Sequence, residues 1–388
     1  MNRHNFHSLA WGIAFVGFTT QFGGGFASGA QIYQYFINFG VWALVMPFLA
    51  QFLMSLFYWY GMRYAYQNKT YDYRSFSDSF YGRFRSVFSN LYEIEYFVMV
   101  CMAPAVAFAT GGSTLQALTG LPYFTCTLII GIFIFLITLF GTDMVRKCSS
   151  ALSILIIVGM MLVLIPNIIV QWDTIANAIQ KLGAGIMPVA SSESGGFFGA
   201  LKSACIYGIF QITAIGLMYQ HTQKVSDEKE IKHSMIYMFL IDALVMELAV
   251  IGLLAIAFLP ELADYDVPML LLVQSGVGSK ILTPIISVLI ILGAVSTGVN
   301  MIAGIVERTT NRITKNKKSN RKTATFLSAL VFTLLAFGIA QFGLIPLVRT
   351  GYSYIGYATL LVIILPFVIH FISHINKKPQ EDSSHAVK

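Results

Sequence analysis

The stretch TTQFGGGFASGA, residues 19–30, lies within a run, residues 8–62, that contains no charged residue. Three consecutive glycines stand at its centre. Each glycine inside a helix costs roughly 1 kcal/mol of helix stability relative to alanine. An unbroken helix over residues 8–36 would be more than about 40 Å long, whereas the hydrocarbon core of a bilayer is about 30 Å thick. The stretch therefore predicts a helix that breaks within the membrane, between about residues 22 and 26.

A break at membrane depth leaves backbone NH and CO groups without helical partners, which is tolerated only where they face protein or a water-filled cavity. A half-helix that starts near Phe26 and Ala27 would point free NH groups towards an anion such as a carboxylate. The half-helix before it would offer carbonyls to a cation. Alternatively, Gly23, Gly24 and Gly25 serve close helix packing, which accounts for one glycine better than for three.

The composition is that of a membrane protein. Hydrophobic residues make up 56% of the 388 residues and charged residues 11%, against roughly 25% charged residues in a soluble domain. The net charge of +7 comes from basic residues spread over several connections, so we expect a lipid bilayer and no nucleic acid as partner. The four cysteines have no paired spacing, which argues against a disulfide framework or a zinc site.

Apolar segments of the length that a bilayer requires, about 20 residues, predict an all-α protein with ten transmembrane helices. They cover approximately residues 8–36, 41–66, 91–118, 121–140, 147–170, 197–220, 234–259, 280–306, 323–342 and 346–374. Because five is odd, the two sets of five, about 8–170 and 197–374, have opposite orientations, as in the inverted repeats of secondary transporters. We expect a single transmembrane domain, 1–388, whose residues 375–388 form a cytoplasmic tail.

The basic residues predict which side of the membrane each connection faces, since cytoplasmic loops carry the excess of Lys and Arg. Four connections on one side hold Arg63, Lys69, Arg74, Arg83, Arg85, Arg146, Lys147, Lys224, Lys229, Lys232, Arg308, Arg312, Lys315, Lys317, Lys318, Arg321 and Lys322. The other side includes DTIANAIQKLG, residues 173–183, which predicts a short amphipathic helix capped by Asp173. We therefore expect a multi-pass protein of the plasma membrane with both termini in the cytoplasm.

The sixth span corresponds to the first in the inverted repeat, and its Gly208, Gln211 and Thr213 fall near mid-depth. We expect an irregular helix over residues 208–213 that packs against the broken first span and gives the protein a second discontinuous helix. The candidate substrate-binding residues of the two spans are Gly23, Gly24, Gly25, Phe26, Ser28, Tyr207, Phe210, Gln211 and Thr213.

The eighth span contains LGAVSTGVNMIAGIVER, residues 292–308, a cluster of small and hydroxyl residues in an aliphatic run. Ser296 and Thr297 would supply hydroxyl oxygens to a hard cation such as sodium. Alternatively, they hydrogen-bond back to their own helix, as Ser and Thr commonly do in membrane spans. Composition alone favours the second interpretation.

Ionisable residues inside membrane spans are candidates for function. Asp242 lies about ten residues into the seventh span, near mid-depth. It would couple transport to an ion, by binding a cation or carrying a proton, or else make a structural hydrogen bond to a neighbouring helix. Glu93 and Glu95 begin the third span near cytoplasmic arginines, which favours a surface salt-bridge network for both.

The pattern GGGFASGAQI, residues 23–32, together with the ten-span layout, resembles the bacterial YkvI-like membrane proteins and, more distantly, the LeuT-fold amino-acid transporters of the APC superfamily. The resemblance in topology covers nearly the whole chain. It implies that the glycine break binds a substrate carboxylate. The sodium site that it implies consists of the carbonyls of Thr19 and Phe22 with Gly293, Ser296 and Thr297. The substrate-contacting tyrosine of sodium-coupled relatives has no counterpart in MAPAVAFATGGS, residues 102–113, so the substrate's identity cannot be carried over.

The function that the sequence favours is secondary transport of a small, amino-acid-like solute, coupled to sodium or protons. No Walker motif is present to use ATP, and no cofactor is expected other than a sodium ion. A membrane scaffold or sensor with a transporter fold is the first alternative. An intramembrane enzyme is less favoured, because no nucleophile–base pair or metal cluster can be assembled at one depth. The sequence leaves the solute, the coupling ion, the direction of transport and the oligomeric state open.

Overall fold

The computed structural model describes the backbone of residues 3–140, 142–189, 191, 196–316 and 320–375, and the side chains of these residues except 3–8, 142–153, 315–316 and 374–375. All regular structure in this part of the chain is helical. The predicted tail lies outside the described residues except for its first residue, Ile375.

The helices follow in chain order, with η for 3-10 or π segments. They are α1 (Arg3–Gln21), α2 (Gly24–Ala27), α3 (Ala30–Tyr35), η1 (Ile37–Leu44), α4 (Met46–Asn68), α5 (Tyr73–Phe80), η2 (Gly82–Phe84), α6 (Arg85–Thr119), α7 (Tyr123–Phe140), α8 (Thr142–Val170), α9 (Trp172–Gly183), α10 (Phe197–Ile212), η3 (Thr213–Leu217), η4 (Tyr219–Lys224), α11 (Glu228–Leu254), η5 (Pro260–Asp264), α12 (Pro268–Ser275), α13 (Ser279–Asn316), α14 (Arg321–Ala340), α15 (Leu344–Pro346), η6 (Leu347–Gly351), α16 (Tyr352–Thr359), η7 (Leu360–Ile364) and α17 (Leu365–Ile375).

The first span is discontinuous, as predicted. Helix α1 ends at Gln21, and α2 begins at Gly24 after an extended Gly23. A second interruption, which the sequence analysis did not predict, separates α2 from α3 at Ser28 and Gly29. Gly29 has a φ of 81°, a left-handed conformation that glycine adopts at little cost. The Ser28 carbonyl accepts a hydrogen bond from the Met269 amide at 2.9 Å, which ties this turn to α12.

The sixth span is irregular too, but later than predicted. Helix α10 continues as a regular α-helix to Ile212, and the change to 3-10 geometry begins at Thr213. Gly208 lies within the regular helix, where a Cβ atom would approach the Ala50 carbonyl oxygen of α4 to 2.8 Å. This glycine therefore allows close packing of α10 on α4 and does not mark the interruption, so the expectation for residues 208–212 was wrong.

Long apolar helices account for most of the predicted spans. By length and composition, seven of the described helical stretches are able to cross a membrane, or up to nine if two bent pairs each count as one span. With the two bent pairs included, these nine stretches correspond in order to the predicted second to tenth spans. The broken first span is not among them. The count of ten crossings remains a prediction.

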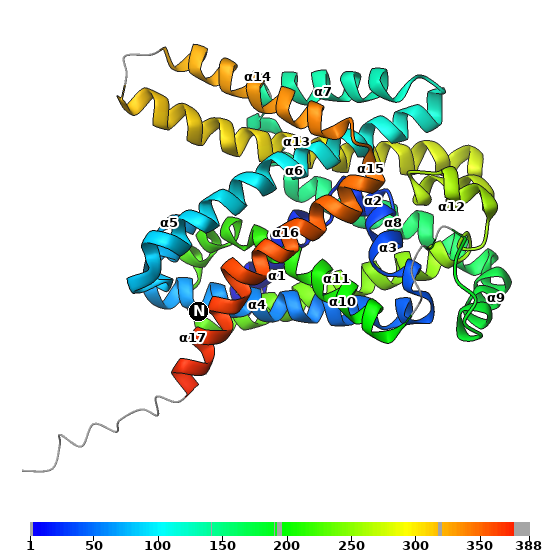
Figure 1. The fold of residues 1–388 in the computed structure, drawn as a ribbon, viewed down its shortest axis with the longest axis horizontal. Helices are drawn as coiled ribbons and strands as arrows, with labels where there is room; N and C mark the ends of the chain where they lie inside the picture. The colour runs from blue at the N-terminus through cyan, green and yellow to red at the C-terminus, as the bar shows by residue number, and fades with distance from the viewer. Residues whose placement is uncertain (1–2, 141, 190, 192–195, 317–319, 376–388) are drawn as a thin grey trace, which may run out of the picture.

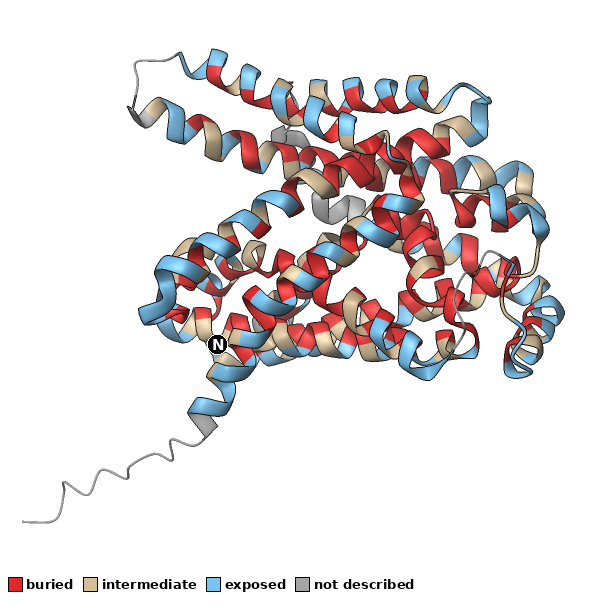
Figure 2. Ribbon diagram, in the orientation of Figure 1, coloured by how far each residue is buried: buried red, intermediate tan, exposed pale blue. Residues whose placement is uncertain are grey.

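The surfaces of the outer helices are those of a protein in lipid. Figure 2 shows exposed residues along the outer faces of α7 and α14 and buried residues where helices meet. Large apolar side chains are exposed on these two helices: Phe124, Leu128, Ile129, Ile132, Phe133, Leu136, Phe140, Phe326, Leu327, Val331, Leu334 and Leu335. Apolar surface of this extent is stable against hydrocarbon and not against water.

The helices form two groups that meet at the broken first span. One group consists of α6, α7, α13 and α14, which pack against one another and include the uppermost helices of Figure 1. In the other, α1 packs on α11, α11 on α4, and α4 on α10. Helix α1 belongs to this second group, whereas the short helix α2 contacts α6 and α13 of the first, so the glycine break between α1 and α2 lies where the two groups meet.

The two ends of the molecule have different elements. Helix α5, the start of α1 and the end of α17 lie at one end in Figure 1, and α9 and α12 lie at the opposite end. The amphipathic helix predicted at residues 173–183 is present as α9. Its first helical residue is Trp172 and its cap position is Gln171. Asp173 is therefore inside the first turn, where a carboxylate favours the helix dipole, and the predicted cap at Asp173 was wrong.

Candidate functional site

The glycine triplet brings the first and eighth spans into direct contact. A Cβ atom on Gly23 would lie 2.7 Å from Oγ1 of Thr297. One on Gly24 would lie 2.8 Å from Cβ and 2.9 Å from Cα of Ala294. All three distances are below van der Waals contact, so only glycine fits between the break and α13. The triplet serves the break and the close packing together, which the sequence analysis treated as alternatives.

The first amide groups of α2 have no acceptor within the helix. The first amides of any helix have no acceptor within that helix, and Gly23 at the cap position has no side chain to supply one. The amides of Phe26 and Ala27 donate to the Gly23 carbonyl, each at 3.1 Å. The amides of Gly24 and Gly25 precede these and have no acceptor within α2.

The residues predicted to bind sodium line one cavity. It has a volume of about 320 Å³, and its walls include Thr19, Phe22, Gly293, Ser296 and Thr297. Shared access to one cavity is a condition that a common cation site must meet. The rest of the wall includes Thr20, Tyr96, Leu217, Gln220, His221 and Asn300.

The hydroxyl groups in this cavity are bonded to their own helices. The Thr297 hydroxyl donates to the Gly293 carbonyl at 3.0 Å, and the Ser296 oxygen accepts from the Asn300 amide at 3.5 Å. The Thr19 hydroxyl lies 3.0 Å from the carbonyl oxygens of both Phe15 and Val16. Back-bonding of Thr297 uses its hydroxyl hydrogen, which leaves lone pairs on the oxygen, so it does not exclude cation coordination.

A smaller cavity of about 20 Å³ adjoins the glycine break. Among the predicted substrate-binding residues it is lined by Gly23, Gly24, Gly25, Phe210 and Gln211. It shares Thr20, Thr297 and Met301 with the larger cavity. The structure thus places the break, the end of α10 and the eighth span around the smaller cavity.

The other predicted substrate-binding residues do not line this cavity. The Phe26 ring packs on Phe22 with the ring centroids 3.9 Å apart, and the Ser28 hydroxyl donates to the Gly25 carbonyl at 2.9 Å. The Tyr207 hydroxyl accepts from Nε2 of Gln211 at 3.2 Å. These three side chains therefore contact residues that line the two cavities without lining the smaller cavity themselves.

The residues of the smaller cavity that were missed in the sequence analysis include Gln21, Gln31 and Tyr352. Gln21 and Gln31 flank the glycine triplet, and uncharged polar residues beside a helix break are a signal that could have identified them. Tyr352, from the tenth span, stacks on Phe210 with the ring centroids 4.7 Å apart. Nothing in the sequence distinguishes it from the other tyrosines.

Asp242 is fully buried in α11, and neither carboxylate oxygen has a hydrogen-bond partner among the described residues. Gln21, which lines the smaller cavity, lies next to it. Tyr58 and Tyr207 are close enough to interact with it electrostatically. Asp242 lies among side chains of the first, second and sixth spans but does not itself line either cavity.

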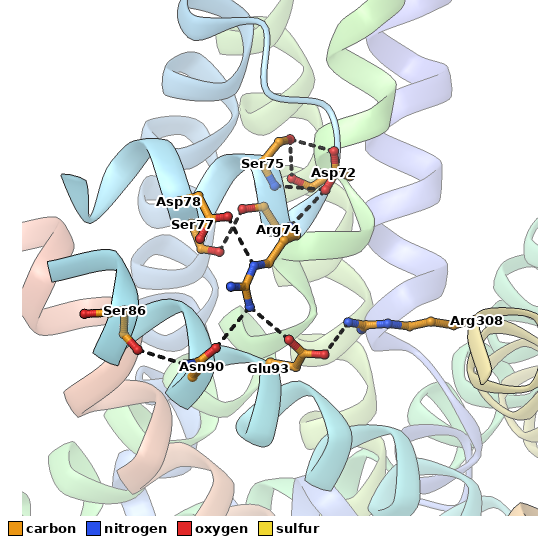
Figure 3. Close-up of polar contacts among 9 residues, drawn as sticks. All are labelled: Asp72, Arg74, Ser75, Ser77, Asp78, Ser86, Asn90, Glu93 and Arg308. Atoms are coloured by element: carbon orange, nitrogen blue, oxygen red, sulfur yellow. Dashed lines mark hydrogen bonds and ion pairs between the residues drawn. The ribbon is translucent and has the colours of Figure 1, made fainter. Parts of the chain in front are cut away.

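The two glutamates at the start of the third span differ. Figure 3 shows Glu93 between Arg74 and Arg308, at 2.9 Å and 2.6 Å, which agrees with the predicted surface network. Glu95 is only 4% exposed, and its Oε1 is in hydrogen-bond contact with the hydroxyl oxygens of Thr213 and Thr359. Two residues along a helix rotate the side chain by about 200°. Glu95 therefore points into the protein, and the expectation of a surface salt bridge for it was wrong.

Solved structures of transporters share the fold of this chain. The complex of MhsT with L-phenylalanine is 13% identical, with a TM-score of 0.60, and the match covers 95% of this chain and 88% of that one. A Na⁺-coupled sialic acid symporter is also 13% identical, with a TM-score of 0.60 and coverage of 93% and 79%. A mutant of the Eremococcus coleocola manganese transporter is 15% identical, with a TM-score of 0.50 and coverage of 99% and 91%.

No protein-family model and no curated protein matches the chain. The structural matches span almost the whole chain, so the predicted LeuT-like transporter fold is confirmed. The matched proteins are transporters and not enzymes.

Proposed function

We propose that the protein is a secondary active transporter of a small, amino-acid-like solute, coupled to sodium or protons. The observation that carries the proposal is the break at Gly23, which lines a cavity between the two helix groups whose wall also includes Gln21, Gln31 and Gln211. A spanning helix is broken at such a depth only where its backbone groups have protein or a cavity to face. The fold shared with sodium-coupled and amino-acid-binding proteins supports the same function.

The solute site is proposed at the smaller cavity. The free amides of Gly24 and Gly25 suit a carboxylate, and the side-chain amides of Gln21, Gln31 and Gln211 suit an ammonium or hydroxyl group. A cavity of about 20 Å³ holds about one water molecule. A solute therefore requires the stacked rings of Phe210 and Tyr352 to separate, and they would then line the wall beside its apolar part.

The larger cavity is proposed as the access path and cation site. Its volume of about 320 Å³ is in the range of small-molecule pockets, about 300–1,000 Å³. It contains His221 and Gln220, which follow the sixth span on its basic, predicted cytoplasmic side. This conformation is then open towards the cytoplasm.

The sodium-coupled version is tested by replacing Ser296 and Thr297 together with alanine. Solute binding to the purified protein is expected to lose its sodium dependence, because the site loses two oxygen ligands of the type that hard cations require. Thermal shifts with a panel of amino acids, with and without sodium, measure this. Ser287→Ala is the matched control, since Ser287 is also back-bonded within α13 at 2.7 Å but lies outside both cavities.

Solute binding that is indifferent to sodium in the unaltered protein would contradict the sodium site and leave proton coupling. Solute binding without uptake into proteoliposomes under any gradient would favour the scaffold or sensor. Chemical turnover of the solute would favour an enzyme.

Asp242 is the proposed ion-coupling residue. Asp242→Asn is expected to abolish the sodium or pH dependence of uptake into proteoliposomes, because the amide has the size of the acid but neither binds a proton nor attracts a cation. Glu247→Gln, five residues further along α11, is the control. If Asp242→Asn retains the wild-type dependence on both ions, Asp242 is structural.

A further inference from the structure

A second buried carboxyl group, that of Glu95, connects the third, sixth and tenth spans. In α6, Oε1 of Glu95 is in hydrogen-bond contact with the hydroxyl oxygens of Thr213, the first residue of η3, and Thr359, the last residue of α16. Its other oxygen, Oε2, is buried and has no hydrogen-bond partner among the residues that the structure describes. Both threonines stand where helix geometry changes, from α to 3-10 at Thr213 and from α to π after Thr359.

No positive group accompanies this carboxyl group among the described residues. None of the described ion pairs includes Glu95. The titratable groups close enough to interact with it are the phenols of Tyr81 and Tyr92, and the buried Tyr219 phenol interacts with both of them. The Tyr81 hydroxyl donates to the Val362 carbonyl at 2.7 Å, so it does not donate to Glu95.

Counting hydrogens indicates which form of Glu95 this arrangement holds. The Thr359 hydroxyl oxygen is in close contact with three other oxygens: Oε1 of Glu95, Oγ1 of Thr213 at 2.6 Å, and the carbonyl oxygen of Ile355 at 2.8 Å. Each close oxygen–oxygen contact requires one hydrogen. The two threonines supply two hydrogens, and a carbonyl and a carboxylate supply none.

A proton on Oε1 of Glu95 supplies the third hydrogen. Glu95 then donates to Thr359, Thr359 donates to the Ile355 carbonyl, and Thr213 donates to Thr359, so that every donor is used once. With an ionised Glu95, Thr359 would have to serve two acceptors with one hydrogen. The buried Oε2 agrees with this assignment, because an uncharged carbonyl oxygen without a partner costs less than a charged one.

We propose that Glu95 is a proton-binding site that couples protonation to the position of the sixth span. The inference rests on the proposed transport function and assigns a proton-binding residue to it. In the present conformation the proton is on Oε1. When η3 moves away with Thr213, the O–H bond breaks, the proton passes to water, and the Thr359 hydroxyl turns to donate to the carboxylate.

The sixth span connects this site to the proposed solute site. Thr213 follows Gln211 by two residues, and Gln211 lines the smaller cavity. The Tyr58 hydroxyl donates to the Gln211 carbonyl at 3.1 Å, so the end of α10 is held at the cavity while the 3-10 segment continues towards Glu95. Because Thr213 follows these residues closely in the chain, a solute that displaces Phe210 and Gln211 also shifts Thr213 relative to Glu95.

Infrared spectroscopy of the full chain tests the protonation without any solute. A carboxylic acid has a C=O stretching band that neither a carboxylate nor an amide has, so Glu95→Gln is expected to remove one such band. Glu93→Gln, two residues away and ion-paired at the surface, is expected to leave the band unchanged. Asp242→Asn is expected to retain the Glu95 band. Identical bands in wild type and Glu95→Gln at every pH would overturn the proposal.

Transport into proteoliposomes tests the coupling. Glu95→Gln, which resembles the protonated acid in size and can donate to Thr359, is expected to keep solute exchange at the wild-type rate and to lose accumulation driven by a pH gradient. Unchanged pH-driven accumulation in this variant would overturn the coupling. Loss of both solute exchange and accumulation would also overturn it, because that result indicates a structural role for Glu95.

Sodium at the same oxygens is the competing outcome. A sodium-dependent thermal shift that is lost in Glu95→Gln and in Thr359→Val, but kept in the double variant of Ser296 and Thr297, would replace the proton by a cation. If wild type transports no solute under any gradient, the proposed function fails. The infrared band still decides whether Glu95 carries a proton.

Discussion

The backbone of Gly24 lies so close to α13 that one methyl group would collide with it. A Cβ atom there meets not only the Ala294 side chain but also its Cα at 2.9 Å, and backbone cannot yield as a flexible side chain can. Overpacking of this kind typically costs about 1–3 kcal/mol. Gly24→Ala is therefore expected to lower the melting temperature of the purified protein and to weaken solute binding.

Gly12→Ala is the matched control for this variant. Gly12 lies in α1, and a Cβ atom on it would meet nothing within 4 Å. Alanine is the better helix former, so this change is expected to be neutral or stabilising. Equal melting temperatures for the two variants would show that the contact between the glycine break and α13 is looser than described.

Single residues also show where prediction from sequence ends. The acidic character of Glu93 and Glu95 was visible, but the surface ion pair holds only for Glu93, because a helix turns two neighbouring carboxylates to different faces. The residues that Glu95 meets come from spans more than a hundred positions away. Periodicity along one helix cannot identify such partners, and only the packing of spans does so.

Helix α5 shows how a single cap defines an element. The Asp72 carboxylate accepts from the amides of Arg74 and Ser75 at 3.0 Å and 2.9 Å, which satisfies amides that the helix cannot. Partial burial acts to raise the pKa of Asp72, but the hydroxyl of Ser75 and these two amides outweigh it and lower the pKa overall.

A lowered pKa in the folded state means that the cap stabilises α5 above the unfolded pKa, about 3.9 for aspartate, and that this stabilisation is lost as the pH falls through the lower folded value. Asp72→Ala is expected to speed hydrogen exchange of the amides of α5 at neutral pH. Against wild type at the same pH, the difference is expected to shrink as the pH falls below the unfolded value of about 3.9 and through the lower folded value. A difference that persists there would mean that the charge of Asp72 does not support the helix.

The two broken helices differ in how far the sequence predicts them. In the first span, three glycines and excess length act together, and the break occurs where they stand. In the sixth span the only glycine near mid-depth serves packing on α4, and the change at Thr213 has no local residue that demands it. Its causes are long-range, namely the contacts of Thr213 with Thr359 and Glu95.

At the scale of the whole molecule, the separation into two helix groups gives the first span its role. Helix α1 packs on α11 in one group, and α2 packs on α6 and α13 of the other. A relative movement of the groups therefore changes the geometry at Phe22 and Gly23 first, because the regular helix is interrupted there, between the end of α1 and the start of α2. This is the mechanical reason to expect solute and ion binding at the break.

The last prediction concerns the orientation of the whole molecule. The basic connections assign α5 and both termini to the cytoplasm. The structure has α5, the start of α1 and the end of α17 at one end and α9 at the other (Figure 1), as an even number of crossings requires. Single cysteines at Ser86, beside α5, and at Asn177, on α9, test this in a background without Cys101, Cys126, Cys148 and Cys205.

Ser86 and Asn177 are both exposed, so each introduced thiol is within reach of a reagent on its own side. A membrane-impermeant maleimide added to intact cells is expected to label Asn177→Cys and to label Ser86→Cys only after the membrane is opened. The reverse pattern would invert the topology and place the larger cavity on the outside. Labelling of both in intact cells would contradict a bilayer between these two ends of the molecule, and with it the assignment of α9 to the outer face.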